Sequence, residues 1–298
     1  MKKNWKYGIL ALLVAGFAIT YLVMPKGPAR PVLPMPNGYE DLLKAAQPAV
    51  SDRHLAFGDA SDDELKDLVN RNRVALNLAR IGCARECRVT TDYGVAAEVY
   101  AAQHLPVLAQ FKKLALAFRA EGELAEREGR TKDAARIYLD GIRFAQEMCR
   151  GGLLIDRLVG IATERINLDP LRRLELDAAT CREAARALEQ MEFRREPIEA
   201  TWTEEKFWTS RVGSLRERIG FQLVRIVRPK VIEAPRQVSA SKLAEVQTHT
   251  RQVMLQLAAR AYEVEHGKYP DPPGQLVPDY LQMLPKHPVN GEVLTFEP

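Results

Sequence analysis

The sequence has 298 residues, of which 46% are hydrophobic and 28% are charged. Such a chain can bury a sizeable core, in one large domain or two small ones. The formal net charge is only +4, and basic and acidic residues are interleaved along most of the chain, which argues against a nucleic-acid partner. Aromatic residues make up 7%, whereas Ala, Leu, Arg and Glu dominate, so we expect an all-α fold.

The first residues predict a membrane-spanning helix. Three lysines occur within residues 1–6, and residues 7–24 contain no charged side chain. A helix of that length spans about 27 Å, close to the hydrocarbon thickness of a bilayer. Trp5, Tyr7 and Tyr21 lie near its two ends, where aromatic rings favour the membrane interface. We therefore expect residues 7–24 to contact the membrane.

Two interpretations of residues 1–24 remain open. A signal peptide could be cleaved after Ala18, but the apolar run extends to Val23 and favours a retained signal anchor. Three lysines precede the span, and Lys26 and Arg30 follow it. The positive-inside rule then places the body outside the cytoplasm. We expect a single-pass protein of the inner membrane with its body on the periplasmic side.

A proline-rich linker is predicted over residues 25–38. It contains five prolines, a spacing that is typical of an extended and semi-rigid chain. Such a linker would hold the body away from the membrane.

The next segment, residues 39–200, is predicted to be a helical body. Ser61 and Glu64 have the spacing of a capping box, which marks the start of a helix. Pro106 and Pro170 are expected to end helices, because proline lacks the backbone N–H that an α-helix needs. Together with apolar periodicity, these signals predict helices over residues 39–49, 65–79, 93–102, 108–128, 132–149, 153–167 and 180–195.

Residues 108–149 form a predicted helical hairpin with small residues where its two helices would meet. Gly129 is placed to make the turn, and Tyr138 to fill the groove between the helices. This hairpin resembles a tetratricopeptide repeat. The resemblance rests on five helix-packing positions: Gly122, Gly129, Ala134, Tyr138 and Gly141. It implies a helical-hairpin body whose grooves bind a protein partner.

Residues 201–266 are predicted to form long helices, over 202–227 and 243–266, with a connector at 231–241. Gly267 is placed to cap the second helix. The first of these helices, together with the residues that follow it, is basic. Such a segment indicates either a surface that faces lipid or phosphate, or a solvated face that pairs with nearby glutamates. The solvated face is the favoured interpretation. The basic residues are Arg211, Arg216, Arg218, Arg225, Arg228 and Lys230.

The remaining residues, 267–298, are rich in proline and are predicted to be irregular, with a short strand at 292–296. This tail and the preceding helix contain a Gly267-Lys268-Tyr269-Pro270 turn followed by Pro-rich loops. That order of motifs resembles the end of type II secretion pseudopilins. The whole arrangement, from anchor to tail, resembles a class of planctomycete envelope proteins. These resemblances imply placement in the cell envelope.

The residues that most often carry chemistry show no familiar catalytic or metal-binding spacing. Cys83 and Cys87 are four residues apart, which on a helix would favour a local disulfide over a metal site. Each histidine is interpreted as a surface or capping residue; the five are His54, His104, His249, His266 and His287. We therefore expect no cofactor, no metal and no catalytic residue.

The predicted function is a non-catalytic, membrane-anchored scaffold or interaction protein of the cell envelope. One alternative is a component or client of a type II secretion-like assembly, acting through the tail. A second alternative is an envelope hydrolase.

Overall fold

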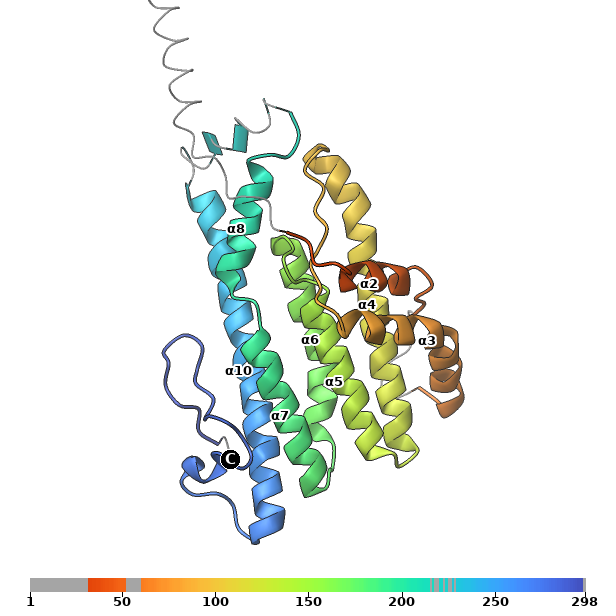
Figure 1. Cartoon of the computed structure of the whole chain (residues 1–298), viewed down its shortest axis with the longest axis vertical. Coiled ribbons are helices and arrows are strands. Elements are labelled where there is room, and N and C mark those ends of the chain that lie inside the picture. The colour runs from red at the N-terminus through yellow and green to blue at the C-terminus, as the bar shows by residue number, and fades with distance from the viewer. Residues whose placement is uncertain are drawn as a thin grey trace, which may run out of the picture. The chain divides into compact units, whose positions relative to one another are not determined.

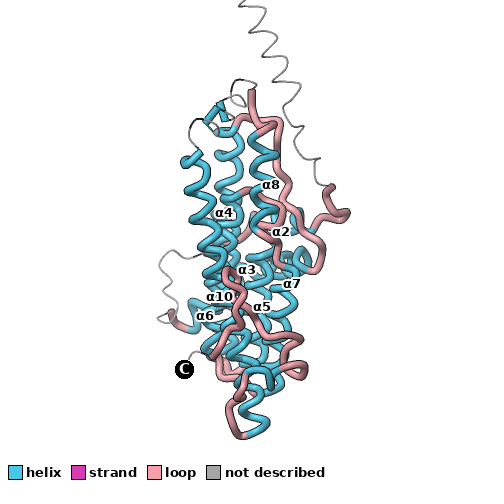
Figure 2. Tube along the Cα trace, turned by 90° about the vertical axis from the view of Figure 1, so that its left-hand side faces the viewer, coloured by secondary structure: helices cyan, strands magenta, loops and turns pink. Residues whose placement is uncertain are grey.

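The computed structural model describes residues 32–51, 60–214, 216, 220, 221, 223, 224, 227 and 229–296. Within them every regular element is helical, and Figures 1 and 2 show helices joined by loops. The all-α prediction is therefore confirmed. Where a strand was predicted at 292–296, a single bridge pairs Lys286 with Val293.

The predicted anchor, residues 7–24, lies outside the described residues, as does the first half of the linker, residues 25–31. Among the helices that are described, none combines the length and the apolar character needed to cross a bilayer.

The first described helices are α2 (Gly38–Ala46) and α3 (Asp62–Cys83). The predicted capping box is confirmed, because the Glu64 N–H donates to Ser61 Oγ and the Ser61 N–H donates to the Glu64 carboxylate at 2.7 Å. Asn37 caps α2, and its side chain also bonds both the N–H and the carbonyl of Arg88. The Asn37 side chain thereby joins the start of α2 to the loop that follows α3.

Helix α4 (Ala97–Arg127) is continuous, so the prediction of two helices separated near Pro106 is wrong. Proline at this position leaves the carbonyl of Ala102 without its usual helical donor. Both Ala102 and Pro106 are exposed, so water can satisfy that carbonyl.

Helices α5 (Thr131–Glu147), α6 (Leu154–Arg173) and α7 (Ala178–Arg194) follow. Pro170 lies inside α6 and does not end it, which corrects the prediction of a helix over 153–167. The carbonyl that this proline frees is that of Ile166, and Arg119 from α4 donates to it at 3.5 Å. A side chain distant in sequence thus replaces the missing donor.

The region after α7 differs most from the prediction. Helix α8 (Ile198–Thr209) ends well before residue 227, and the chain turns at Gly213, which has φ +67°. Helix α10 (Pro229–His266) includes the predicted connector at 231–241 and continues through Pro235. Its end is as predicted, with Gly267 at φ +68° and its N–H bonded to Glu263.

Two apolar clusters hold these helices. One joins α2, α3, α4 and α5 around Phe111, Phe118 and Phe144. The other joins α5, α6, α7, α10 and the tail around Tyr138 and Leu188. Figure 1 shows α7 and α10 side by side along much of their length, with the tail folded back beside them. Helix α5 contributes to both clusters, so it links the two parts of the body.

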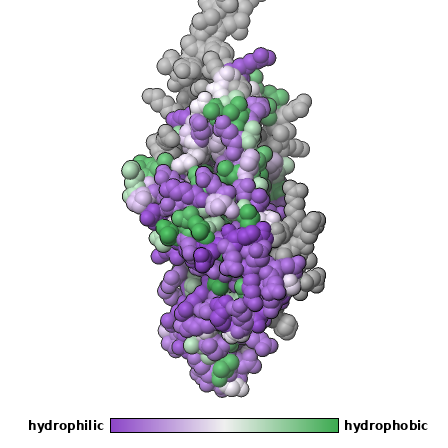
Figure 3. Space-filling view, turned by 90° about the vertical axis from the view of Figure 1, so that its right-hand side faces the viewer, coloured by the Kyte–Doolittle hydropathy of each residue, from purple (hydrophilic) through white to green (hydrophobic). Residues whose placement is uncertain are grey.

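The surface mixes charged and apolar side chains. On the face shown in Figure 3, hydrophilic residues cover most of the lower half, and apolar residues gather in separate patches higher up. Opposite charges meet across helices, as where Arg80 of α3 contacts Glu121 of α4 and Asp140 of α5. The interleaved charges of the sequence are thus partly paired in space.

Candidate binding site

Of the five helix-packing positions, Gly122 and Gly141 lie at close helix contacts. A Cβ atom built on Gly122 would stand 2.3 Å from the Tyr138 ring, and one on Gly141 would stand 2.5 Å from Asn167. Such distances are impossible, so only glycine fits at either position. Gly129 has φ +73° and turns the chain between α4 and α5, while Ala134 is fully buried. These residues serve the packing of the body.

The resemblance to a tetratricopeptide repeat predicts that a partner binds in the grooves of the hairpin. The packing of α4 against α5 fills the groove between these two helices. Tyr138 is fully buried and belongs to the same apolar cluster as Leu188 of α7 and Val253 of α10. Its hydroxyl donates to Glu126 at 3.2 Å. Tyr138 therefore fills the space between α4 and α5, and a protein partner of the hairpin stays a prediction.

The four cysteines are free and buried in the structure. Helix α3 ends at Cys83, and Cys87 lies in the loop that follows, so the two do not share a helix face. Burial raises the pKa of Cys87 to about 12 and that of Cys149 to about 11. Thiols with such pKa values stay protonated at neutral pH and react slowly. The local Cys83–Cys87 bridge stays a prediction.

The tail is fixed to the body by buried contacts. Tyr280 and Leu281 pack into the α7–α10 cluster. The buried carboxylate of Glu189 on α7 accepts the backbone N–H groups of Gln282 and Met283 at 2.9 and 3.1 Å. Arg251 on α10 donates to the carbonyl of Lys286. The Pro-rich tail is therefore an integral part of the helical body.

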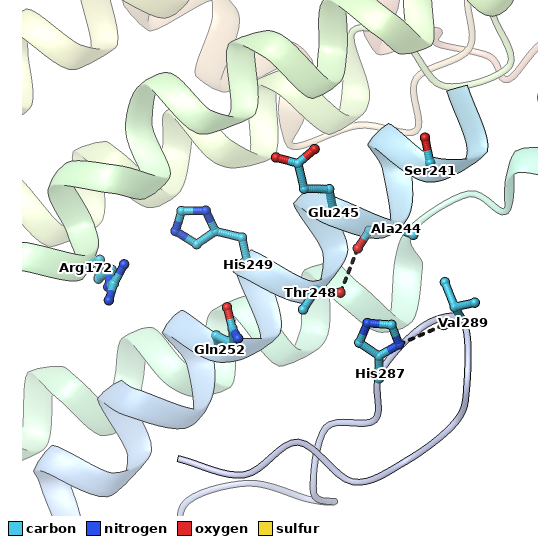
Figure 4. A pocket seen from close by; sticks show the side chains of 9 residues that line it. All are labelled: Arg172, Ser241, Ala244, Glu245, Thr248, His249, Gln252, His287 and Val289. Carbon is cyan, nitrogen blue, oxygen red and sulfur yellow. Dashed lines mark hydrogen bonds between the residues drawn. The ribbon is translucent and has the colours of Figure 1, made fainter. Parts of the chain in front are cut away.

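Where the tail passes α10, it forms one side of an open recess of about 490 Å³. Figure 4 shows that α10 supplies one wall, while His287 and Val289 approach from the tail and Arg172 from α6. Along α10 the lining residues recur at helical spacing, which places them on one stripe: Ser241, Ala244, Glu245, Thr248, His249 and Gln252.

Two histidines far apart in sequence line this recess. His287 accepts the N–H groups of Val289 and Asn290 at Nδ1, so its ring proton lies on Nε2. Burial lowers the pKa of His249, although Asp169, 3.5 Å from its Nε2, acts in the opposite direction. His249 is therefore neutral at pH 7. The recess presents the neutral His249 imidazole and the His287 ring beside the Arg172 guanidinium.

The tail carries exposed apolar side chains, of which Val289 lines the recess. Val289 is 74% exposed, and Met283 and Val293 are also largely exposed. These side chains are held on a tail whose backbone is bonded to α7 and α10, so little chain entropy remains to be lost when a partner binds them. Exposed apolar groups beside polar ones are typical of protein-binding surfaces.

A second group of polar residues is buried where α4, α6 and α8 meet. Asp156 is fully buried; it accepts the Leu153 N–H at 2.8 Å and the Nε2–H of His104 at 2.6 Å. The His104 ring stacks on Tyr100, which in turn contacts Trp208. An imidazole oriented by a carboxylate also occurs in hydrolase active sites. Here Asp156 also caps the start of α6, which is a structural role.

Sequence reasoning missed both groups of residues. His104 and Asp156 are 52 positions apart, and His249 and His287 come from different elements. The sequence identified the histidines as residues that could carry chemistry. Only the fold shows that His104 lies beside Asp156 and that His249 and His287 line one recess. Among the residues that the structure describes, no three His, Cys, Asp or Glu side chains gather closely enough to hold a metal ion.

Comparison of the chain with family models, with curated proteins and with solved structures found no match.

Proposed function

We propose that this protein is a non-catalytic, membrane-anchored scaffold of the cell envelope that binds a protein partner. The observation that carries the proposal is the recess between α10 and the tail, with exposed Val289 beside it. The predicted anchor and extracytoplasmic orientation complete the proposal, and both rest on the sequence of residues 1–30.

The chemistry of the recess fits a polypeptide. Its imidazole rings, together with the Arg172 guanidinium, offer donors to backbone carbonyls or carboxylates of a bound segment. Val289 and Val293 offer apolar contacts beside them. A rigid surface of this kind can hold an extended segment without ordering itself first.

A site-specific crosslinker tests the assignment. With p-benzoylphenylalanine at Val289, we expect a discrete crosslinked product in intact cells. Val74 on α3 is the matched control, because it is a valine of similar exposure, 64% against 74%, on another part of the body. V293E should abolish the Val289 product while the helical circular-dichroism signal is unchanged. Equal products from both positions, or turnover of a substrate by the purified protein, would refute the scaffold.

The alternative of a type II secretion-like assembly needs a different test from simple truncation. Removing residues 258–298 would delete Ala261, Leu276 and Leu281 from the apolar cluster and destabilise the body. Point substitutions at Val289 and Val293 leave that cluster intact. Under this alternative, the product crosslinked at Val289 is a secretion component, which mass spectrometry identifies.

The hydrolase alternative is favoured by one observation, the buried pair of His104 and Asp156. If that pair is catalytic, H104N abolishes any hydrolytic activity of the purified protein while crosslinking from Val289 persists. The scaffold proposal expects the reverse pattern, with V293E disrupting partner binding and H104N leaving it intact.

A further inference from the structure

The tail contains a narrow hairpin, residues 285–294, closed by two backbone hydrogen bonds. The His287 N–H donates to the carbonyl of Glu292 at 2.7 Å, and the Leu294 N–H donates to the carbonyl of Pro285 at 2.9 Å. In an antiparallel pair of strands, two bonds spaced in this way enclose a pair of opposite residues that do not bond each other. The backbone groups of that enclosed pair point away from the hairpin.

The enclosed pair is Lys286 and Val293, which form the one bridge of the tail. Each residue therefore presents its backbone N–H and C=O on an outer edge of the hairpin. On the first edge the carbonyl of Lys286 accepts a hydrogen bond from Arg251, so this edge faces α10. On the other edge the N–H and C=O of Val293 have no hydrogen-bond partner among the residues that the structure describes. One edge is thus joined to the body and the other is unpaired.

The unpaired edge continues to Thr295. Its backbone groups likewise form no hydrogen bond within the described part of the chain, and both Val293 and Thr295 are exposed. Leu294 and Phe296 alternate with these two residues and pack against the apolar cluster of α7 and α10. Alternation with a period of two is the pattern of a strand with one buried face. Residues 292–296 therefore form an edge strand that the body holds in place.

An edge strand of this kind is a template for another strand. Its unpaired N–H and C=O groups are already spaced for a ladder of backbone hydrogen bonds. Proteins often block such an edge with proline or a charged side chain, whereas Val293 and Thr295 are β-branched residues that favour strand pairing. A strand added here would place every second side chain beside Leu294 and Phe296 on the face toward the body. Apolar side chains suit those positions.

We propose that an extended segment of the protein partner, apolar at every second position, adds as a strand to residues 292–296. The inference rests on the proposed function, because the partner that binds beside Val289 supplies this segment. A second copy of the chain is the weaker candidate, since two edges this short bury far less than the roughly 1,200 Å² of a stable interface. A partner that also contacts Val289 and the recess does not depend on the edge alone.

Proline substitutions test the backbone bonds directly. In the full-length protein carrying p-benzoylphenylalanine at Val289, T295P and V293P each remove one outward N–H and leave both bonds of the hairpin intact. We expect each to reduce the crosslinked product in intact cells by about two- to ten-fold, the effect of one lost hydrogen bond. The control T295V keeps the N–H and should leave the yield unchanged, and V293A should retain more product than V293P.

Hydrogen exchange on the purified variants verifies the hairpin. The amides of His287 and Leu294 should stay protected in T295P and in V293P, because their acceptors are untouched. The pair V293P and V293A gives the same comparison at a second position if T295P loosens the hairpin.

The outcomes separate this inference from the proposed function. Equal yields from each proline variant and its matched control would overturn strand addition and leave the partner in place. Absence of any product from Val289 in the otherwise unchanged chain would overturn the partner, and strand addition with it. A product of twice the mass of the chain would identify a second copy as the occupant and overturn the choice of a separate protein.

Discussion

Two buried polar clusters join the helices in different ways. In the Arg195 cluster, Arg195 of the α7 end binds Glu164 of α6 through two nitrogens and Glu192 through its Nε at 2.6 Å, and Arg251 binds the other oxygen of Glu192. Each carboxylate faces a guanidinium. In the Asp156 cluster the central carboxylate is held by a backbone N–H and by the ring of His104.

The difference concerns what each cluster loses when one member is removed. Burial disfavours the charge of Arg195, but Glu164 and Glu192 more than offset it and raise the pKa of the guanidinium. Removing Arg195 therefore leaves the buried carboxylate of Glu164 without its countercharge and leaves Glu192 with Arg251 alone. Removing Asp156 instead leaves donors without an acceptor, which costs less. Substitutions in the Arg195 cluster thus report the cost of an unpaired buried charge, and substitutions in the Asp156 cluster report the cost of lost buried hydrogen bonds.

The largest effect is expected from R195M. The substitution keeps most of the side-chain volume but leaves the buried Glu164 without a countercharge, and it should lower the free energy of unfolding by about 3–5 kcal/mol. Urea denaturation followed by circular dichroism measures the change. The double variant R195M/E164M should recover part of the loss; if it is less stable than R195M, the clustered charges are not the cause.

A smaller loss is expected from D156A. It removes the acceptor of the Leu153 N–H and of His104, and should cost roughly 2–3 kcal/mol by the same assay. H104F keeps a ring that can stack on Tyr100 but deletes the donor to Asp156. A cost for H104F equal to that of D156A would show that the His104 bond, rather than the cap of α6, dominates this cluster.

Asp177 offers an exposed counterpart of the Asp156 cap. It caps α7 by accepting the Thr180 N–H at 2.7 Å, and that bond, followed by the bond from the Thr180 hydroxyl, lowers the pKa of the carboxyl. D177A should cost about 1 kcal/mol. The lowered pKa means that this stabilisation is present above the ordinary pKa of Asp and is lost as the pH falls through the folded-state value. If D177A lowers the free energy of unfolding more than D156A does, burial does not strengthen the contribution of a helix cap.

The smallest effect concerns Glu205, which accepts the Leu154 N–H at 3.0 Å beside Asp156. Burial raises its pKa, so its contribution to stability is complete below the ordinary pKa of Glu and is lost as the pH rises through the folded-state value. E205Q keeps an acceptor oxygen without the charge. We expect E205Q to match the wild type in acid and to be slightly more stable at neutral pH, as measured by thermal unfolding across pH. A stability difference that does not change with pH would refute this assignment.

Local signals in the sequence predicted the ends of helices well. The Ser61 capping box and the turns at Gly129 and Gly267 are confirmed, because each depends on residues close together in the chain. The prolines misled the prediction, since their effect depends on distant neighbours. Pro170 remains inside α6 because Arg119 of another helix takes the freed carbonyl, and no local pattern contains that information.

The candidate sites could not be predicted for the same reason. Glu164 and Arg195 are 31 positions apart, and Arg251 lies on yet another helix. The part of α10 that lines the recess falls almost entirely within the predicted helix over 243–266, but the recess also requires the tail to fold against α10, and the sequence indicated only an irregular segment there. The residue types indicated which side chains could carry chemistry. The packing of the helices determines which of these side chains lie close together.

The return of the tail to α7 also constrains the order of folding during synthesis. Tyr138 and Tyr280 belong to one apolar cluster, yet more than a hundred residues separate them. At ribosomal rates of 5–20 residues per second, the hairpin of α4 and α5 must wait roughly 10–30 s for its last packing partners. During that interval apolar faces of α5, α6 and α7 are open to water. A chaperone or a nearby bilayer that shields them would therefore act before the tail is made, when the nascent chain is most prone to aggregate.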